Sequence, residues 1–293
     1  MTVDLPDAKY FRLIADTNDP RDESALSLKL KGITGFHSDD YVPPVIREAG
    51  ELITLISDES HIKGHVAVSL VALPVLGSEK LCKYEDALAD LVARFGIPHI
   101  HFSEIFGRKN VAGRNPTRFL DAYAQIVSSI PMSCLSLSKS RAELIRSFQE
   151  DGYSNEELFH SLFWNHVDRF AAKMVPHSVL HINREVDNNF TKDECIQEFH
   201  KLLGGVAQIE SLRRHRHSVC RHPHFFTKKA LLYSSVADLA AYGSNLIQYK
   251  LDTGVAAKKV ARRYKPLLVV LKRVFTNYTG LASAELVALV RAS

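Results

Sequence analysis

The sequence predicts an α/β protein in which helices flank a mixed β-sheet. Apolar, β-branched runs alternate along the chain with amphipathic helical stretches, and the first two runs are separated only by a polar turn that contains glycine. Such alternation is typical of a layered α/β fold, and the two adjoining runs predict a β-hairpin. Of the 293 residues, 46% are hydrophobic and 24% are charged. This composition excludes collagen-like, disordered and disulfide-scaffold proteins.

The expected sheet begins with the hairpin. Residues 52–56 and 66–73 form its strands, and residues 61–64 form its turn. Neither run alternates cleanly between apolar and polar side chains, so both strands are expected to be buried on both faces. An amphipathic helix over 79–95 follows and ends at Gly96. Residues 98–102 are strand-like, and a helix is expected over 116–129.

The later elements continue the alternation. They are a strand over 132–137, a long helical stretch over 141–174, a strand over 178–182, a helix over 192–203, an irregular basic segment over 212–226, a helix over 235–250 and one or two closing helices. The acidic, turn-rich residues 1–50 are interpreted as an N-terminal extension. Residues 51–250 then form the main α/β domain, and residues 251–293 form a basic helical segment packed on it.

The compartment is predicted from cysteines and apolar runs. The four cysteines lack C-x-x-C spacing, which indicates reduced thiols in a cytoplasmic protein. The longest apolar stretch, residues 65–76, contains Pro74 and is too short to span a bilayer. The N-terminus lacks the pattern of a signal peptide. We therefore expect a soluble cytoplasmic protein with no membrane partner, and the oligomeric state stays open.

Charge is divided unevenly along the chain. From Glu210 to the end there are 15 Lys and Arg against four Asp and Glu, whereas the first 209 residues carry an excess of acid. A basic C-terminal third favours a polyanionic partner, because Lys and Arg neutralise phosphates. A solvated helix face is the alternative. The residues expected to contact nucleic acid are Arg213, Arg214, Arg216, Arg221, Lys258, Lys259, Arg262 and Arg263.

Acidic residues are expected near strand ends and on a late helix. Asp58 follows the first strand and shares its parity, and Glu104 does the same after residues 98–102. The strand over 178–182 runs into the acid- and amide-rich segment 183–189. Asp238 lies off the buried stripe of the helix over 235–250, whose small residues would let it pack closely on a sheet. Each acid also has a plain structural explanation: a hairpin turn, a helix N-cap, a surface loop or a complement to the helix dipole.

The four acidic positions would all be explained if their carboxylates converged at one edge of the sheet. Clustered carboxylates repel one another unless a hard cation lies among them, and oxygen ligands select Mg²⁺ or Mn²⁺. Two such ions stabilise the attacking and leaving oxygens in phosphoryl transfer. The sequence therefore predicts a divalent-metal site.

Three segments carry a resemblance to a known family. They are Ile56-Ser57-Asp58-Glu59-Ser60, His101-Phe102-Ser103-Glu104-Ile105-Phe106 and Ala237-Asp238-Leu239-Ala240. In order and spacing they resemble the domain-of-unknown-function family numbered 3800, which is widespread in bacteria and phages and is grouped with the RNase H-like fold. The resemblance covers roughly residues 51–250. It implies an RNase H-like mixed sheet that opens with a β-hairpin, flanked by helices.

The resemblance also implies a ligand set. Asp58, Glu104 and Asp238 correspond to metal-ligating carboxylates. The chain departs from the family at Asn183, where relatives often have an acid, so Glu185 or Asp187 would have to serve. His61 replaces the usual glycine after Ser60, and Ser234-Ser235 replaces Leu-Gln before the late helix.

Three functions follow as hypotheses. The first is a metal-dependent nuclease, or a related phosphoryl-transfer enzyme, acting on RNA or DNA with Mg²⁺ or Mn²⁺ as cofactor. The second is a catalytically inactive RNase H-like module that binds nucleic acid or protein. This hypothesis is motivated by Asn183, where relatives often have an acid. The third is an enzyme acting on a small phosphorylated substrate, which would require a deep closed pocket.

Overall fold

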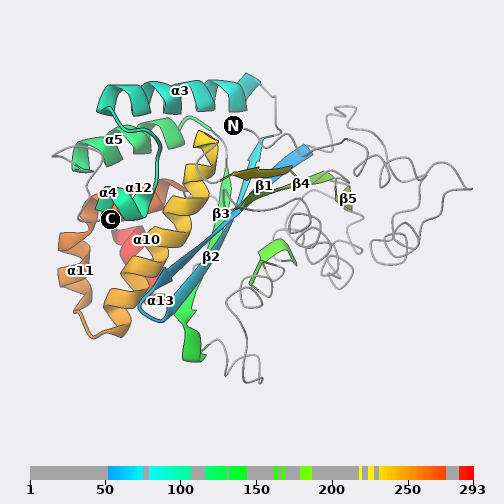
Figure 1. Ribbon diagram of the computed structural model, residues 1–293. Coiled ribbons are helices and arrows are strands. Elements are labelled where there is room, and N and C mark those ends of the chain that lie inside the picture. Colours follow the sequence, from blue (N-terminus) through cyan, green and yellow to red (C-terminus); the bar gives the residue numbers. More distant parts are fainter. Residues whose placement is uncertain are drawn as a thin grey trace, which may run out of the picture.

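The computed structural model describes residues 52–74, 79–106, 116–130, 132–143, 162–163, 166–168, 179–186, 218–219, 224–227, 231–274 and 284–293. Within these ranges helices pack on a mixed sheet (Figure 1), so the predicted α/β class is confirmed. The expected N-terminal extension over 1–50, most of the helical stretch over 141–174 and all of the helix over 192–203 lie outside the described residues.

The described strands form one sheet with the first strand near its centre. The strands are β1 (Leu52–Ile62), β2 (His65–Pro74), β3 (Ser133–Ser140), β4 (Val179–Val186), β5 (Ser218–Val219) and β6 (His224–Thr227). Their order is β3-β2-β1-β4-β5, and β6 also pairs with β4. The pairs β1–β2 and β2–β3 are antiparallel, whereas β4 is parallel to β1, β5 and β6.

The β1–β2 hairpin closes through a two-residue turn. Lys63 and Gly64 both have positive φ, 45° and 83°. Positive φ at both central residues characterises the type I′ turn, whose twist matches that of the flanking strands. This tight turn pairs Ile62 with His65, so the strands are longer than predicted. The hairpin prediction is confirmed, but the polar residues after Ile56 belong to β1 and not to the turn.

The strand β4 also extends beyond its predicted end. The sequence predicts a strand over 178–182, whereas β4 continues to Val186. Residues from Asn183 to Val186 pair with β6, and this second partner sustains the strand. Both β5 and β6 lie within or next to the segment 212–226, which the sequence predicts to be irregular. That prediction is wrong for these residues, because their pairing to β4 depends on the tertiary structure.

The helices named below lie on one side of the sheet and pack against one another. They are α3 (Glu79–Phe95), α4 (Phe102–Phe106), α5 (Pro116–Val127), the 3₁₀ helix η2 (Leu232–Ser234), α10 (Ser235–Asp252), α11 (Ala257–Arg263), α12 (Lys265–Val274) and α13 (Ala284–Ala292). The helix α3 has the predicted limits. Gly96 follows it with φ of 63°, and the N–H groups of Gly96 and Ile97 donate to the carbonyls of Ala93 and Val92. These paired bonds form a Schellman motif, which ends the helix.

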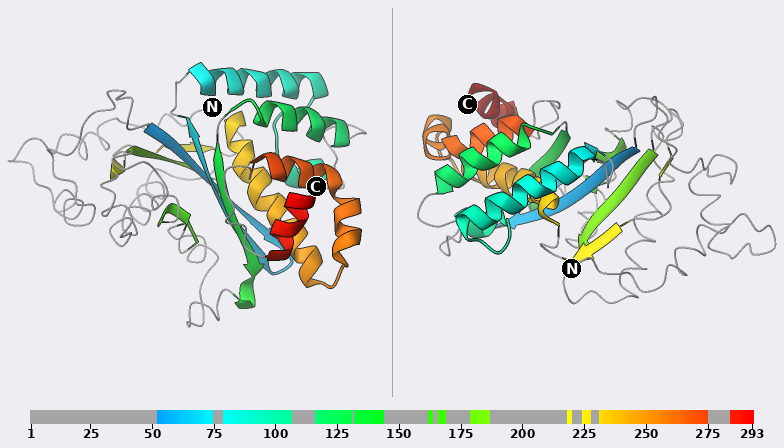
Figure 2. Two further views of the ribbon diagram at one scale, coloured as in Figure 1. Left: turned by 180° about the vertical axis from the view of Figure 1, so that it is seen from behind. Right: turned by 90° about the horizontal axis from the view of Figure 1, so that it is seen from above.

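The helix α10 packs directly against the sheet. It contacts β1, β2 and β3, and α12 packs on α10 and α5. Figure 2 shows α10 lying along the sheet with α12 farther out. Gly243 permits a close approach between the two helices: a Cβ at this position would lie 3.1 Å from Leu271 Cδ2 and 3.2 Å from Leu267 Cδ1.

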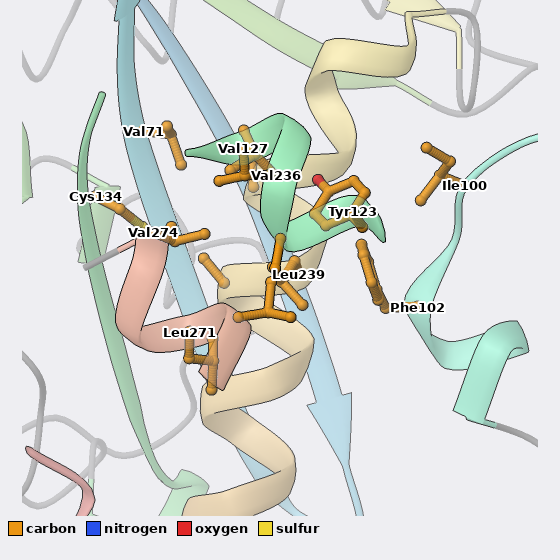
Figure 3. Close-up of a cluster of buried hydrophobic side chains, with 14 of the residues drawn as sticks. Val71, Ile100, Phe102, Tyr123, Val127, Cys134, Val236, Leu239, Leu271 and Val274 are labelled. Carbon is orange, nitrogen blue, oxygen red and sulfur yellow. The ribbon is translucent and has the colours of Figure 1, made fainter. Parts of the chain in front are cut away.

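The main hydrophobic core lies between the sheet and these helices. Figure 3 shows side chains from the sheet, the helices and the loop before α4 meeting there; those labelled are Val71, Ile100, Phe102, Tyr123, Val127, Cys134, Val236, Leu239, Leu271 and Val274. Burial raises the pKa of the Cys134 thiol well above its ordinary value. Cys134 and the exposed Cys82 are both free thiols, as expected, and the other two cysteines lie outside the described residues.

The opposite face of the sheet is also covered. Val66, Val68 and Leu70 alternate with the residues that face α10, and all three are buried. The buried His166 ring donates from Nε2 to the carbonyl of Val68 at 2.9 Å. Phe163 is fully buried as well. The prediction that the hairpin is buried on both faces is therefore confirmed.

The strand predicted over 98–102 is absent from the described sheet. Residues 97–101 instead connect α3 to the short helix α4. The backbone N–H of Phe102 donates to the carboxylate of Asp238 and not to a neighbouring strand. The apolar side chains of Ile100 and Phe102 enter the helical side of the core. The alternation of apolar and polar residues that predicted a strand here arises because a connecting segment buries every second side chain.

Candidate functional site

Asp58 lies inside the central strand β1. It pairs with Ser69 of β2, and the strand continues for four residues beyond it to Ile62. The prediction that Asp58 ends the strand is therefore wrong, because the Lys63-Gly64 turn sets a longer hairpin register. Asp58 shares the α10-covered face with Ile56 and is half-buried. Its Oδ1 accepts the backbone N–H of Glu59 at 2.8 Å.

Ser69 connects this strand position to the start of α10. Its side chain is fully buried, and its Oγ donates to the carbonyl of Ala237 at 2.8 Å. The same Oγ lies 3.5 Å from the carbonyl oxygen of Asp58. Asp238 follows Ala237 directly, so one serine holds the segments of both aspartates together.

Asp238 links α10 to α4. It stands in the first helical turn, half-buried between the buried Ala237 and Leu239, as predicted for a residue off the apolar stripe. Its Oδ2 accepts the backbone N–H of Phe102 at 2.7 Å. The ring of Phe102 is fully buried and packs edge-on against Tyr123, with 5.2 Å between ring centroids. Asp238 thereby fixes the first residue of α4.

Glu104 projects from α4 among histidines. The distance from Glu104 Oε2 to His99 Nε2 is 2.9 Å, and that from Oε1 to His101 Nδ1 is 3.4 Å. An ionised carboxylate only accepts hydrogen bonds, so His99 donates its Nε2–H. His101 Nδ1 also lies 3.0 Å from the Ser103 hydroxyl. Glu104 was predicted to end a strand and instead lies in a one-turn helix, with its two oxygens each facing an imidazole.

The amide-rich strand end predicted at 183–189 is partly inside β4. Asn183 is fully buried and pairs with Ile56 of β1 and with His224 of β6. Ser57 pairs with Arg184, so Glu185 occupies the strand position next to that of Asp58. The side chain of Glu185 and the whole of Asp187 lie outside the described residues.

The three predicted acidic segments are thus joined by hydrogen bonds. Ser69, which pairs with Asp58 in the β1–β2 hairpin, donates to the carbonyl of Ala237, and the Asp238 carboxylate accepts the N–H of Phe102. Among the side chains that the structure describes, no three His, Cys, Asp or Glu are arranged to hold a metal ion. Glu185 and Asp187 are not among these side chains. The metal site therefore stays a prediction. The structure shows the hydrogen bonds that hold the segments of Asp58, Asp238 and Glu104 in place.

A buried polar layer, which the sequence reasoning missed, fixes α10 along the sheet. Ser136 and Ser244 share a hydrogen bond of 2.6 Å, and Ser138 donates to Asn245 Oδ1 at 2.8 Å. Asn245 in turn donates from Nδ2 to the carbonyl of Ser60 at 2.9 Å. All these side chains are buried. Alternating serines in β3 were the available signal, because polar residues on the buried face of a strand require partners.

Glu85 of α3, also missed, holds the entry to α10. Its two carboxylate oxygens accept the backbone N–H groups of Leu232 and Tyr233, each at 2.8 Å. Burial raises the pKa of Glu85, and the two backbone hydrogen bonds oppose this effect. Nearby, the buried hydroxyls of Tyr123 and Ser235 share a hydrogen bond of 2.9 Å. Loss of water also raises the pKa of Tyr123.

The predicted nucleic-acid contacts divide into two groups. Lys258, Lys259, Arg262 and Arg263 are exposed on α11. The Arg213, Arg214, Arg216 and Arg221 group lies outside the described residues. A further basic residue, Lys272, has a structural role, because its Nζ donates to the carbonyls of Arg291 and Ser293 at the end of α13.

Comparison with known proteins finds no matching family model, no similar curated protein and no similar solved structure. Among the described helices, none is both long and apolar enough to cross a membrane.

Proposed function

We propose that the protein is a divalent-metal-dependent nuclease of RNase H-like fold, or a related phosphoryl-transfer enzyme acting on nucleic acid. One observation carries the proposal: the segments of Asp58, Asp238 and Glu104 are far apart in sequence but connected in space. Asp58 pairs with Ser69 in the hairpin, Ser69 donates to Ala237, and Asp238 accepts the N–H of Phe102 at the start of α4. If the residues at these positions were neutral, their hydrogen bonds would be explained by packing alone. Carboxylates where these segments meet are suited to binding a cation.

The sheet supports the RNase H-like part of the proposal. It is mixed, opens with a long hairpin and has its first strand paired both antiparallel to β2 and parallel to β4. Helices flank it, and further helices follow α10. These are the features that the resemblance to family 3800 implies, with Asp58 on the first strand and Asp238 on a late helix.

The donor set suits Mg²⁺ or Mn²⁺. Asp58, Asp238 and either Glu185 or Asp187 supply carboxylate oxygens, the ligands that these hard cations prefer. A carboxylate offers about four lone-pair sites, so the backbone N–H that each of Asp58 and Asp238 accepts is compatible with metal binding. A bound divalent ion supplies activation of water and stabilisation of charge on the phosphoryl oxygens.

The chain's own residues would position that chemistry. The Ser69 bridge keeps the strand carrying Asp58 against the first turn of α10. The bond from Phe102 to Asp238 places α4, and with it Glu104 and its histidines, beside the same turn. The basic helix α11 would contact the backbone of the nucleic acid, because phosphate contacts orient such a ligand.

The test is cleavage of labelled single- and double-stranded RNA and DNA by the full chain, with Mn²⁺, with Mg²⁺ and with chelator. Asp58→Asn and Asp238→Asn should each lower cleavage by more than about a hundredfold, since each removes a ligand charge. Asp90→Asn, at an exposed position on α3, is the matched control and should cleave like the unmodified protein. Cleavage that survives both ligand changes would remove these residues from the mechanism.

A second candidate is an inactive RNase H-like module that binds nucleic acid or protein. Asn183 favours it, because the resembled family often has an acid at this position, whereas here a fully buried asparagine stands in β4, the strand between β1 and β6. Binding that weakens with salt, with no cleavage under any divalent metal, would select this candidate over the nuclease.

A further inference from the structure

The helix α11 presents a cationic face to solvent. Lys258, Lys259, Arg262 and Arg263 are all exposed, whereas Val260 is fully buried on the opposite side. The chain has seven Lys and Arg between residues 253 and 284 and no Asp or Glu there. The nearest preceding acid, Asp252, accepts hydrogen bonds from His65 and Gln248. It is therefore already engaged at the end of α10.

This arrangement is unfavourable for the helix by itself. Lys258 and Arg262 stand four residues apart, as do Lys259 and Arg263, so each pair shares a face. Like charges at this spacing destabilise a helix. Two such pairs on a seven-residue helix indicate an anionic partner that offsets the repulsion when it binds.

The face suits the backbone of a double helix better than a single strand. Proteins that bind single strands stack bases on exposed aromatic rings. The described aromatic residue next to these cations is Tyr264, between α11 and α12, which is half-buried against the core and has the Arg263 guanidinium over its ring, 5.6 Å from the centroid. Four exposed cations beside one half-buried ring, already covered by Arg263, match phosphates on a duplex surface better than bases.

The length of α10 sets the scale of this surface. Asp238 and Asp252 stand 14 positions apart in α10, and at 1.5 Å per residue they are about 21 Å apart along its axis, with α11 following Asp252 after a short turn. In Figure 1, α4 and α11 both lie on the side of α10 that faces away from the sheet; α4 contacts the first half of α10 at Asp238 and Tyr242, and α11 follows its C-terminal end. A ligand that follows this side meets Glu104 at one end and the four cations at the other.

We infer that α11 is the distal phosphate-binding element of a duplex-binding surface, and that this surface requires a nucleic-acid duplex of about six base pairs or more. The length follows from about 21 Å at 3.4 Å per base pair. This inference rests on the proposed function for the location of the catalytic end. It adds the strandedness and the minimum length of the substrate.

The experiment measures binding without cleavage. The full chain, with chelator present, is titrated into fluorescein-labelled duplexes of about 4, 8, 12 and 16 base pairs, and anisotropy is recorded at several salt concentrations. We expect affinity to rise at least tenfold between the two shortest duplexes. A single strand of the same length should bind more weakly than its duplex.

The variant Lys258→Gln/Arg262→Gln tests α11 itself. It should reduce the salt slope by about two, one for each phosphate that the variant can no longer neutralise, and should abolish the difference between short and long duplexes. The matched control is Lys80→Gln/Lys83→Gln on exposed positions of α3, which should leave both unchanged. Lys259→Gln/Arg263→Gln is the second variant, should the first be unstable.

The outcomes separate the two proposals. A length threshold with no cleavage would support the surface and contradict the nuclease. Cleavage that does not change with duplex length or in the α11 variants would support the nuclease and overturn the proposed duplex-binding surface. Equal salt slopes for the α11 and α3 variants, or tighter binding of single strands, would also overturn it.

Discussion

Asp238→Ala removes the acceptor of the 2.7 Å hydrogen bond that Phe102 donates from the start of α4. A hydrogen bond to a charged group contributes about 1.5–3 kcal/mol, and the negative charge in the first turn of α10 adds about 0.3–1 kcal/mol. Because Asp238 is only half-buried, we expect the free energy of unfolding to fall by about 2–3 kcal/mol. Asp238→Asn keeps an oxygen acceptor and should cost about 1 kcal/mol.

Urea unfolding followed by far-ultraviolet circular dichroism measures both changes. Asp90→Asn on α3 is the control for loss of one exposed carboxylate and should remain within about 0.5 kcal/mol of the unmodified protein. The reasoning is refuted if the alanine variant is as stable as the control. It is also refuted if the asparagine variant is as unstable as the alanine variant, since the retained acceptor would then have no effect.

Manganese separates the structural role of Asp238 from the proposed catalytic one. An ion that binds only the folded chain stabilises it by about 2.7 kcal/mol at a hundredfold excess over its Kd. The unmodified protein should therefore unfold at a higher temperature with Mn²⁺, and Asp238→Asn should show little of this increase. An equal increase in both proteins would mean that Asp238 does not bind the ion.

Three further changes test the scaffold by the same unfolding assay. Gly96→Ala should cost about 1–2 kcal/mol, because alanine is strained at φ of 63° although its Cβ has space. Asn245→Ala should cost about 2–4 kcal/mol, because it leaves Ser138 and the Ser60 carbonyl without their partner, whereas exposed Gln125→Ala should be nearly neutral. Burial raises the pKa of Glu85, so its stabilising effect is greatest at low pH and is lost as pH rises through the raised pKa. Glu85→Gln should therefore gain in stability relative to the unmodified protein as pH rises above the ordinary pKa of a glutamate, about 4.3.

Local patterns predicted the elements whose limits are set locally. The helix α3 has the expected bounds because its apolar spacing and Gly96 act within a few residues. The hairpin was predicted for the same reason, but its register was not. Lys63 adopts the positive φ of a tight two-residue turn. This turn lets the strands pair up to Ile62 and His65, so Asp58 lies within β1 and not after it.

Long-range bonds account for what the sequence did not predict. Residues 98–102 carry a strand-like pattern, yet the N–H of Phe102 bonds to Asp238, 136 positions later in the chain. Asn183 stays in a strand because β6 pairs beside it. The acids of the candidate site were found from sequence because polar residues stand out beside apolar runs. Ser69, which donates to Ala237, and Glu85, which accepts the N–H groups of Leu232 and Tyr233, were not found, because isolated serines and helix glutamates are common.

Glu104 differs from the two aspartates in its surroundings, and this difference predicts a different response to mutation. Its two oxygens each face a histidine nitrogen, at 2.9 and 3.4 Å, whereas Asp58 and Asp238 each accept a backbone N–H. A cation at Glu104 would have to displace an imidazole donor. We therefore expect Glu104→Gln to lower cleavage less than Asp58→Asn does, and to leave the Mn²⁺ concentration for half-maximal cleavage unchanged. If Glu104→Gln raises that concentration as strongly as Asp58→Asn, Glu104 binds the metal directly and its contacts with the histidines are replaced when the ion enters.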